Sequence, residues 1–129
     1  MHDLNLLAIA AAALSAFFLG GLWYSPILFG KAWLAHANAG EQKGHPVIVY
    51  ATSFIFALVS AGLFAYLLGP KPSLEMGVGT GLVVGAGFVA ASFGINYQFS
   101  NRSTTLWMID GGYHIVQFAL YGLILGMWH

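Results

Sequence analysis

The sequence predicts an all-α protein that crosses a membrane as a four-helix transmembrane bundle, with a short interfacial helix between the first two spans. The chain of 129 residues is 59% hydrophobic and 6% charged, whereas soluble domains average about 25% charged residues. Four stretches reach the about 20 predominantly apolar residues that crossing a bilayer requires. Across residues 5–24, 44–69, 76–101 and 103–129, Asp110 is the only Asp, Glu, Lys or Arg. Four basic and four acidic residues cannot cover a soluble domain of this size, so that class is excluded.

Each expected span has recognisable ends. The first span lacks a basic leader, so a cleaved signal peptide is not expected there. Pro70 and Pro72 end the second span in a stiff turn, and Ser103 or Thr104 is expected to cap the fourth. Short links before the third and fourth spans predict antiparallel hairpins. The expected spans, all within a single membrane domain (residues 1–129), are about 4–24, 47–69, 75–99 and 104–127.

The long link after the first span is expected to form an interfacial helix over about 26–38. Ser25 followed by Pro26 is a helix-start signal, because serine caps helices and proline suits the first helical position. Phe29 and Trp33 recur at helical spacing, and aromatic residues beside Lys31 are typical of a helix at the membrane surface. Whether these aromatics do more than anchor the segment stays open. The interfacial motif comprises Trp23, Tyr24, Ser25, Pro26, Phe29 and Trp33.

Glycine residues recur on the last two spans. Gly77, Gly81 and Gly85 are four residues apart, and small residues at this spacing let membrane helices approach closely. Gly122 and Gly126 are expected to act similarly on the fourth span. A packing seam within one bundle is the simpler interpretation, and a seam between protomers is the alternative. Because one protomer of four short helices has little room for an enclosed path, we expect a homo-oligomer.

Asp110 heads a polar stripe on the fourth span. His114, Gln117 and Tyr121 follow it at offsets of four, seven and eleven residues, which places all of these side chains in a narrow arc of one helix face. A carboxylate at mid-bilayer costs about 2.5–3.5 kcal/mol on insertion scales. The stripe therefore predicts a partner, a water-filled cavity or a function at this position.

Two further polar residues are expected to join Asp110. Asn96 and Asp110 both lie near the end of the bundle that carries Arg102. We expect Arg102 to pair with the carboxylate, Asn96 to donate to it, and His114 to continue the hydrogen-bonded line. The resulting candidate ligand or ion pathway comprises Asp110, His114, Asn96, Arg102, Gln117 and Tyr121, roofed by Tyr24 and Trp33.

Three interpretations of this cluster remain open. Polar groups in membrane bundles often lock helices together, at about 0.6 kcal/mol per hydrogen bond on average. Asp and His in series are also what a proton or ion pathway requires. Catalysis by the same pair needs a nucleophile or a metal, and neither is evident. We therefore expect no catalytic residues and no enzyme.

Composition argues against several other functions. Cysteine is absent, which removes disulfides and thiolate chemistry. Zero net charge without a basic run gives nucleic-acid binding no basis. Zinc would need His114, Asp110 and a ligand from another helix, so we expect no metal and no cofactor, haem included. The histidines, none of which have a close helical ligand spacing, are His2, His36, His45, His114 and His129.

The distribution of Lys and Arg predicts the orientation in the membrane. Lys31, Lys43 and Arg102 lie in the first and third links, whereas Lys71 lies on the opposite side. This favours both termini outside and the two charged links in the cytoplasm. The difference is small, so dual insertion, as in very small multidrug exporters, stays open.

Two segments carry a family resemblance. The first is the run from Gly20 to Trp33, with Trp-Tyr-Ser-Pro at 23–26. The second comprises Asn96-Tyr97-Gln98-Phe99, Arg102, Ile109-Asp110-Gly111-Gly112-Tyr113 and Leu125-Gly126-Met127-Trp128. Together they resemble the bacterial membrane family catalogued as domain of unknown function 1761, over essentially the whole chain. The resemblance implies a four-helix integral membrane protein with no established activity. The family-type positions that it marks are Trp23, Tyr24, Ser25, Pro26, Phe29, Trp33, Asn96, Arg102, Asp110 and Tyr113.

These observations predict a protein of a bacterial inner membrane whose partner is the lipid bilayer. We expect a small transport or permeation protein with a polar intramembrane site around Asp110 and His114. Its small-molecule or ion substrate is not named by the sequence. The alternative is a structural or assembly subunit whose polar stripe only locks helices together.

Overall fold

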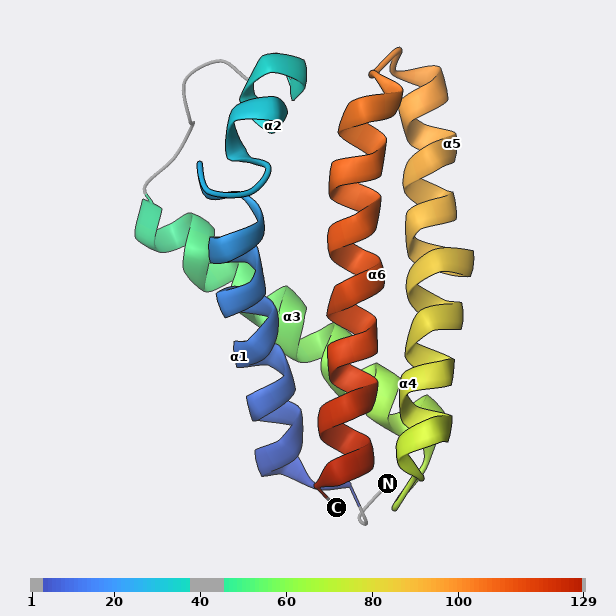
Figure 1. Cartoon of the computed structure of the whole chain (residues 1–129). Coiled ribbons are helices and arrows are strands. Elements are labelled where there is room, and N and C mark those ends of the chain that lie inside the picture. Colours follow the sequence, from blue (N-terminus) through green and yellow to red (C-terminus); the bar gives the residue numbers. More distant parts are fainter. Residues whose placement is uncertain (1–3, 38–45, 129) are drawn as a thin grey trace.

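The computed structural model describes residues 4–37 and 46–128, and throughout these ranges every regular element is a helix (Figure 1). Four helical stretches are long and apolar enough to cross a membrane, namely Leu6–Trp23, Val47–Leu68, Leu74–Phe99 and Thr104–Met127. A short helix, α2 (Gly30–Ala37), lies between the first two. The predicted all-α class is therefore confirmed, including the short helix between the first two spans.

The boundaries follow from local signals. The remaining elements are α1 (Leu6–Trp23), α3 (Pro46–Leu68), α4 (Leu74–Val83), the π-helical segment η1 (Val84–Ala90), α5 (Ala91–Phe99) and α6 (Thr104–Met127). Ser103, rather than Thr104, caps α6, because its Oγ accepts from the Leu106 amide at 3.0 Å. The α3–α4 turn contains Gly69 and Lys71, both with positive φ, a conformation that glycine adopts without strain.

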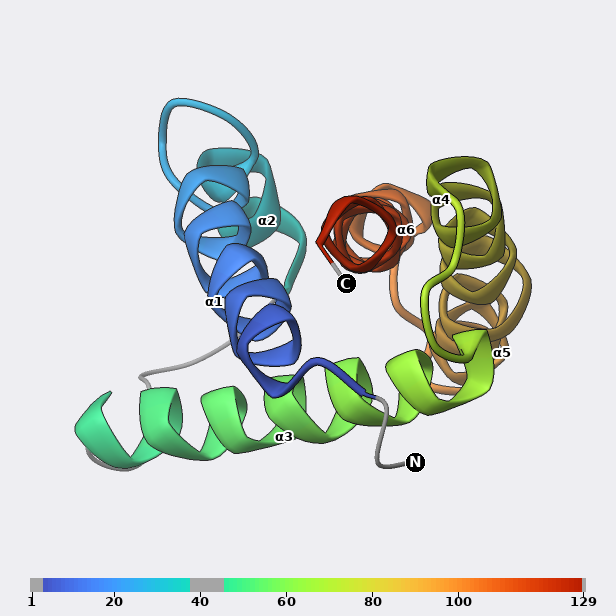
Figure 2. The ribbon, with the colours of Figure 1, turned by 90° about the horizontal axis from the view of Figure 1, so that it is seen from below.

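The helix α6 lies at the centre of the molecule, between α1 on one side and α4, η1 and α5 on the other (Figures 1 and 2). The helix α3 lies along one side of the assembly and slants across it rather than running parallel to its neighbours (Figures 1 and 2). The predicted hairpin between α3 and α4 is therefore splayed. The helix α3 slants because it packs on α1 and α6 near its middle and C-terminal half, where its buried residues lie.

Two alanine stripes join α1 and α3. On α1, Ala8, Ala12 and Ala16 are buried at four-residue intervals, and Ala57 and Ala61 continue the contact on α3. Small residues at this spacing allow close approach of membrane helices, where packing rather than the hydrophobic effect drives association. The alanine stripes thus fix where α3 crosses α1.

The predicted glycine positions hold α4 against α6 within the same chain. A Cβ at Gly77 would lie 2.2 Å from the carbonyl oxygen of Gly122, and one at Gly122 would lie 1.8 Å from that of Gly77. Added Cβ atoms at Gly81, Gly85 and Gly126 would likewise meet backbone of the opposing helix at 2.2 to 2.9 Å. Gly77, Gly81, Gly85 and Gly122 are buried and Gly126 is half-buried, so the glycines form a packing seam within one chain.

The π segment changes which residues of α5 face α6. In an uninterrupted α-helix, the face of Gly77, Gly81 and Gly85 would continue to Asn96. The buried positions instead step from Gly85 to Ala90, five residues on, which is the spacing of a π turn. The indole Nε1 of Trp107 donates to the Ala90 carbonyl at 2.8 Å and satisfies it.

Replacing Gly77 by Ala tests the seam between α4 and α6. We expect Gly77→Ala to lower the free energy of unfolding by about 1–3 kcal/mol, because the new Cβ forces the two backbones apart. Gly79→Ala is the matched control, because nothing lies within 4 Å of a Cβ added at Gly79. The higher helix propensity of alanine is expected to raise the free energy of unfolding of this variant by up to about 1 kcal/mol. Unfolding by SDS in mixed micelles, followed by circular dichroism, measures both. Equal changes in the free energy of unfolding for the two variants would contradict close packing of α4 on α6 at Gly77.

Candidate functional site

A tight turn carries the chain from α1 into α2. The amide of Phe29 donates to the Trp23 carbonyl at 3.0 Å, and that of Gly30 donates to the Ser25 carbonyl at 2.9 Å. A Cβ on Gly30 would lie 2.4 Å from the Tyr24 carbonyl oxygen, so only glycine permits this approach. The turn folds α2 back toward α6.

The predicted start of this helix at Pro26 is wrong, because α2 begins at Gly30. The Ser25 hydroxyl donates back to the Leu22 carbonyl at 2.7 Å, so it does not cap a following helix. The backbone of Ser25 is committed to the turn, and Pro26 is exposed. Local capping preference was overridden by the packing of the turn.

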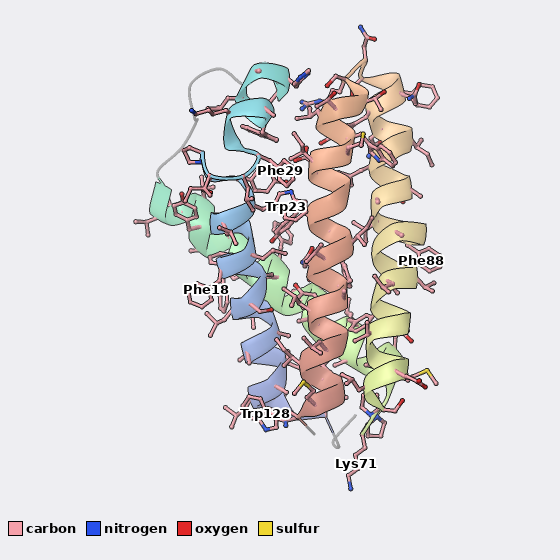
Figure 3. All side chains as sticks on the ribbon, in the orientation of Figure 1. Phe18, Trp23, Phe29, Lys71, Phe88 and Trp128 are labelled. Carbon is pink, nitrogen blue, oxygen red and sulfur yellow. The ribbon has the colours of Figure 1, made fainter. Side chains whose placement is uncertain are left out.

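The turn brings three aromatic side chains to α6. The indole Nε1 of Trp23 donates to the Ile109 carbonyl at 2.9 Å. The Tyr24 hydroxyl donates to Oδ1 of Asp110 at 2.6 Å, and Nε1 of Trp33 donates to the same oxygen at 3.1 Å. Trp23 and Phe29 also pack together, with ring centroids 4.8 Å apart (Figure 3). The polar atoms of these aromatics therefore bind α6, in addition to any anchoring at the interface.

The Asp110 carboxylate is enclosed by three donors from three segments. Tyr97 of α5 donates to Oδ2, while Tyr24 and Trp33 occupy Oδ1. The aspartate is only 8% exposed. Hydrogen bonds to a charged group are worth about 1.5–3 kcal/mol each, which offsets the cost of burying the carboxylate. Burial, then the hydrogen bond to Asp110, raises the pKa of Tyr24 far above its usual value, so this phenol remains a donor.

Asn96 and Arg102 do not take the places that the sequence predicted for them. Within the described part of the chain, neither contacts the carboxylate, and both are exposed. The Arg102 guanidinium lies over the Tyr97 ring, 5.5 Å from its centroid. For Asn96 the physical reason is the π segment, which rotates α5 by one residue and presents Tyr97 to Asp110 in its place.

A second hydrogen-bonded chain follows deeper along α6. Nδ1 of His114 lies 2.5 Å from Oε1 of Gln117, and Nε2 of Gln117 donates to the Tyr121 hydroxyl at 2.7 Å. The Tyr121 oxygen lies 3.0 Å from Oγ of Ser60 on α3. The predicted stripe is thus one face of α6, as expected, but it divides into two clusters. The Asp110 cage comprises Asp110, Tyr24, Trp33 and Tyr97, and the His114 chain comprises His114, Gln117, Tyr121 and Ser60. No hydrogen bond between described residues joins the two clusters.

Two members of these clusters were missed in the sequence. Tyr97 lies beside Asn96 in the second family-type segment, but a register without a π turn points it elsewhere. Ser60 gives no sequence signal, because it is one of several small polar residues on an apolar span. Its place depends on how α3 crosses α6, which is a tertiary property.

The slant of α3 leaves a cavity of about 940 Å³ between α1, α3, α6 and η1. His114 and Gln117 line it, whereas Asp110 and Tyr121 do not. None of the lining residues is Asp, Glu, Lys or Arg. The cavity is therefore an uncharged, mainly apolar space with a few polar groups on its α6 wall, including Tyr113.

Metal ligands do not gather in the described residues. No group of three His, Cys, Asp or Glu side chains there is placed to hold a metal ion. His36 lies at the end of α2 with its Nδ1 3.2 Å from Oγ of Ser103. Three of the other histidines, His2, His45 and His129, lie outside the described residues.

Replacing Tyr97 by Phe tests the Asp110 cage. We expect Tyr97→Phe to lower the free energy of unfolding by about 1.5–3 kcal/mol, since it removes a donor to a buried carboxylate. Asn96→Ala, on the exposed neighbouring position, is expected to change it by no more than about 0.5 kcal/mol. SDS titration in mixed micelles measures both variants.

Adding Asp110→Asn completes a double-mutant cycle. The combined loss of Asp110→Asn and Tyr97→Phe is expected to be smaller than the sum of the single losses, because both remove the same contact. Additive losses, or a larger effect of Asn96→Ala than of Tyr97→Phe, would contradict this geometry.

Comparison with known proteins leads to one family. No curated protein and no solved structure matches the chain. The sequence profile described as "Protein of unknown function (DUF1761)" matches residues 7–126. Both segments of the family resemblance meet at Asp110, one through Tyr24 and Trp33 and the other through Tyr97. The chain belongs to this family of proteins of unknown function, DUF1761, and it has four helices suited to span a membrane.

Proposed function

We propose that this protein is a small transport protein of a bacterial inner membrane that takes an uncharged, mainly apolar molecule into the cavity between α1, α3 and α6. The observation that carries the proposal is the cavity itself. Its volume of about 940 Å³ falls within the about 300–1,000 Å³ of typical small-molecule sites. Such sites combine apolar walls with a few polar groups that orient the ligand, as His114 and Gln117 do here.

The charge of the lining favours an uncharged substrate over an ion. A charged molecule buried without a partner pays a large desolvation cost, and the described lining residues include no charged side chain. Asp110 does not supply one, because its oxygens are occupied by Tyr24, Trp33 and Tyr97. The geometry therefore supports moving the candidate transport site from Asp110 to His114.

Access from the bilayer is supported by the outer wall. Tyr50, Phe56 and Leu63 of α3 line the cavity and are also exposed. On a helix that spans a membrane, exposed residues at this depth meet lipid chains. The exposure of these wall residues therefore supports entry of an amphiphile from the bilayer beside α3.

A structural or assembly role is the second candidate, and the Asp110 cage favours it. The carboxylate joins the end of α1, α2 and α5 to α6, which is the arrangement expected of a lock between helices. A lock at one end and a cavity in the middle are compatible. Only the cavity requires a ligand, so ligand movement separates the two roles.

We also propose that both termini lie outside. Lys31 is in α2 and Arg102 is in the link between α5 and α6, and both of these elements lie at the end of the structure away from the termini (Figure 1). Lys71 lies at the opposite end (Figure 3), and Lys43 lies outside the described residues. Asn5 donates to the Trp128 carbonyl at 3.4 Å, so the start of the first span and the end of the last span lie on the same side. A green fluorescent protein fused after His129 is expected to stay dark, and alkaline phosphatase fused there is expected to be active. Fluorescence with inactive phosphatase would reverse the orientation.

Filling the cavity tests the transport proposal. The probe is a glucosylceramide labelled with nitrobenzoxadiazole, an uncharged amphiphile, in liposomes that contain the protein. Dithionite bleaches only label in the outer leaflet, so complete bleaching reports movement between leaflets. We expect wild-type protein to give complete bleaching and Gly21→Phe to suppress it, because Gly21 lines the cavity and has open space at its Cβ.

Gly79→Phe is the matched control for this substitution. It also has nothing within 4 Å of its Cβ but lies on α4, away from the cavity. We expect it to bleach as the wild type does. If the wild type bleaches no more label than empty liposomes, or if both Phe variants behave alike, the transport proposal fails and the structural role is favoured.

A further inference from the structure

We propose that the cavity selects molecules with a hydroxyl head, an alcohol or a phenol on an apolar body, which donates a hydrogen bond to Nε2 of His114. This inference rests on the proposed function, since it names the substrate class of the same cavity. It follows from the direction of the hydrogen bonds between α3 and α6, which can be traced atom by atom.

Acceptors on α3 set the direction of the Tyr121 hydroxyl proton. Ser60 donates its hydroxyl proton to the Ala57 carbonyl at 3.0 Å. The Tyr121 hydroxyl lies 3.0 Å from the Ser60 oxygen and 3.4 Å from the same carbonyl, so its single proton points toward α3. A hydroxyl has one proton and two lone pairs. The Tyr121 oxygen is therefore left as an acceptor on its α6 side.

Gln117 transmits this direction to His114. Its amide nitrogen donates to the Tyr121 oxygen at 2.7 Å, which orients its Oε1 toward the imidazole. Oε1 lies 2.5 Å from Nδ1 of His114, and an amide oxygen only accepts. Nδ1 must carry the proton, and in the neutral imidazole Nε2 is then an acceptor.

The surroundings of His114 favour the neutral ring. It packs against the rings of Phe93 and Tyr113, with centroids 4.8 and 4.9 Å away. The oxygens of the Asp110 carboxylate accept from other donors. A positive charge on the His114 ring would therefore be buried without a partner, which is costly. Nε2 has no hydrogen bond to any described residue, so an acceptor on the cavity wall is left for a ligand.

Two tyrosine hydroxyls of the lining, those of Tyr24 and Tyr113, do not donate to this acceptor. Tyr24 gives its proton to Asp110, and Tyr113 gives its proton to the Ala16 carbonyl at 2.9 Å. Both then present oxygens rather than protons to the cavity. Phe17, Phe118 and Val89 supply apolar wall for the body of the ligand. The lining is thus complementary to a hydroxyl on an apolar molecule.

The test compares 4-octylphenol with its methyl ether, 4-octylanisole, which has the same apolar body and no donor. Binding is measured with full-length protein in phosphatidylcholine nanodiscs, and nanodiscs with Gly21→Phe correct for partition into lipid. We expect the phenol to bind the wild type about tenfold more tightly than it binds His114→Phe, the effect of one hydrogen bond. The ether is expected to bind both proteins equally. His114→Phe retains an aromatic ring against Phe93 and Tyr113.

A second measurement does not depend on the variant folding. In ¹⁵N-histidine-labelled wild type, the His114 Nε2 resonance is expected in the range of an unprotonated nitrogen and to shift with the phenol but not with the ether. If phenol and ether bind equally and Nε2 does not shift, the hydroxyl selectivity is overturned while the cavity stands. Tighter binding of 4-octylbenzoate than of the phenol would overturn it in favour of a charged ring. If neither uncharged probe binds better than to Gly21→Phe, the proposed function itself fails.

Discussion

The buried carboxylate of Asp110 is the constraint on which the rest of the structure depends. A charged group at this depth is tolerated only when its hydrogen-bonding capacity is filled. Filling it requires donors from the end of α1, from α2 and from α5. The turn at Gly30 and the π segment η1 are the two irregular features of the backbone that deliver these donors. Both irregular features place hydrogen-bond donors around one buried carboxylate.

The sequence predicted what is local and periodic. The apolar runs predicted the spans, Ser103 was one of two caps named, and helical spacing placed Asp110, His114 and Tyr121 on one face. What it missed depends on partners distant in the chain. The π turn is stabilised by an indole from α6, and it exchanges Asn96 for its neighbour at the carboxylate. No local pattern in residues 84–90 predicts that exchange, because the stabilising contact is tertiary.

The slant of α3 was equally inaccessible to sequence reasoning. Hydropathy predicts that a helix crosses the bilayer but not its angle, which packing sets. Here the buried alanines of α1 and α3 belong to one core cluster, which includes Ala12 and Ala61, so packing in this cluster sets the angle of α3. One consequence is the cavity, which exists because α3 departs from α1 toward its N-terminal end. The candidate site therefore depends on small residues that make no polar contact with it.

The two polar clusters on α6 differ in which helices they hold. The Asp110 cage ties the end of α1, α2 and α5 to α6, and its three hydrogen bonds to the carboxylate involve no described residue of α3. The His114 chain ends on α3, through Ser60. The helix α3, which forms the outer wall of the cavity, is thus held by packing and by the His114 chain rather than by the three donors to Asp110. Because the Tyr121 proton points toward α3, the Tyr121 oxygen is left to accept from Gln117, so the position of α3 and the orientation of His114 depend on one hydrogen-bonded chain.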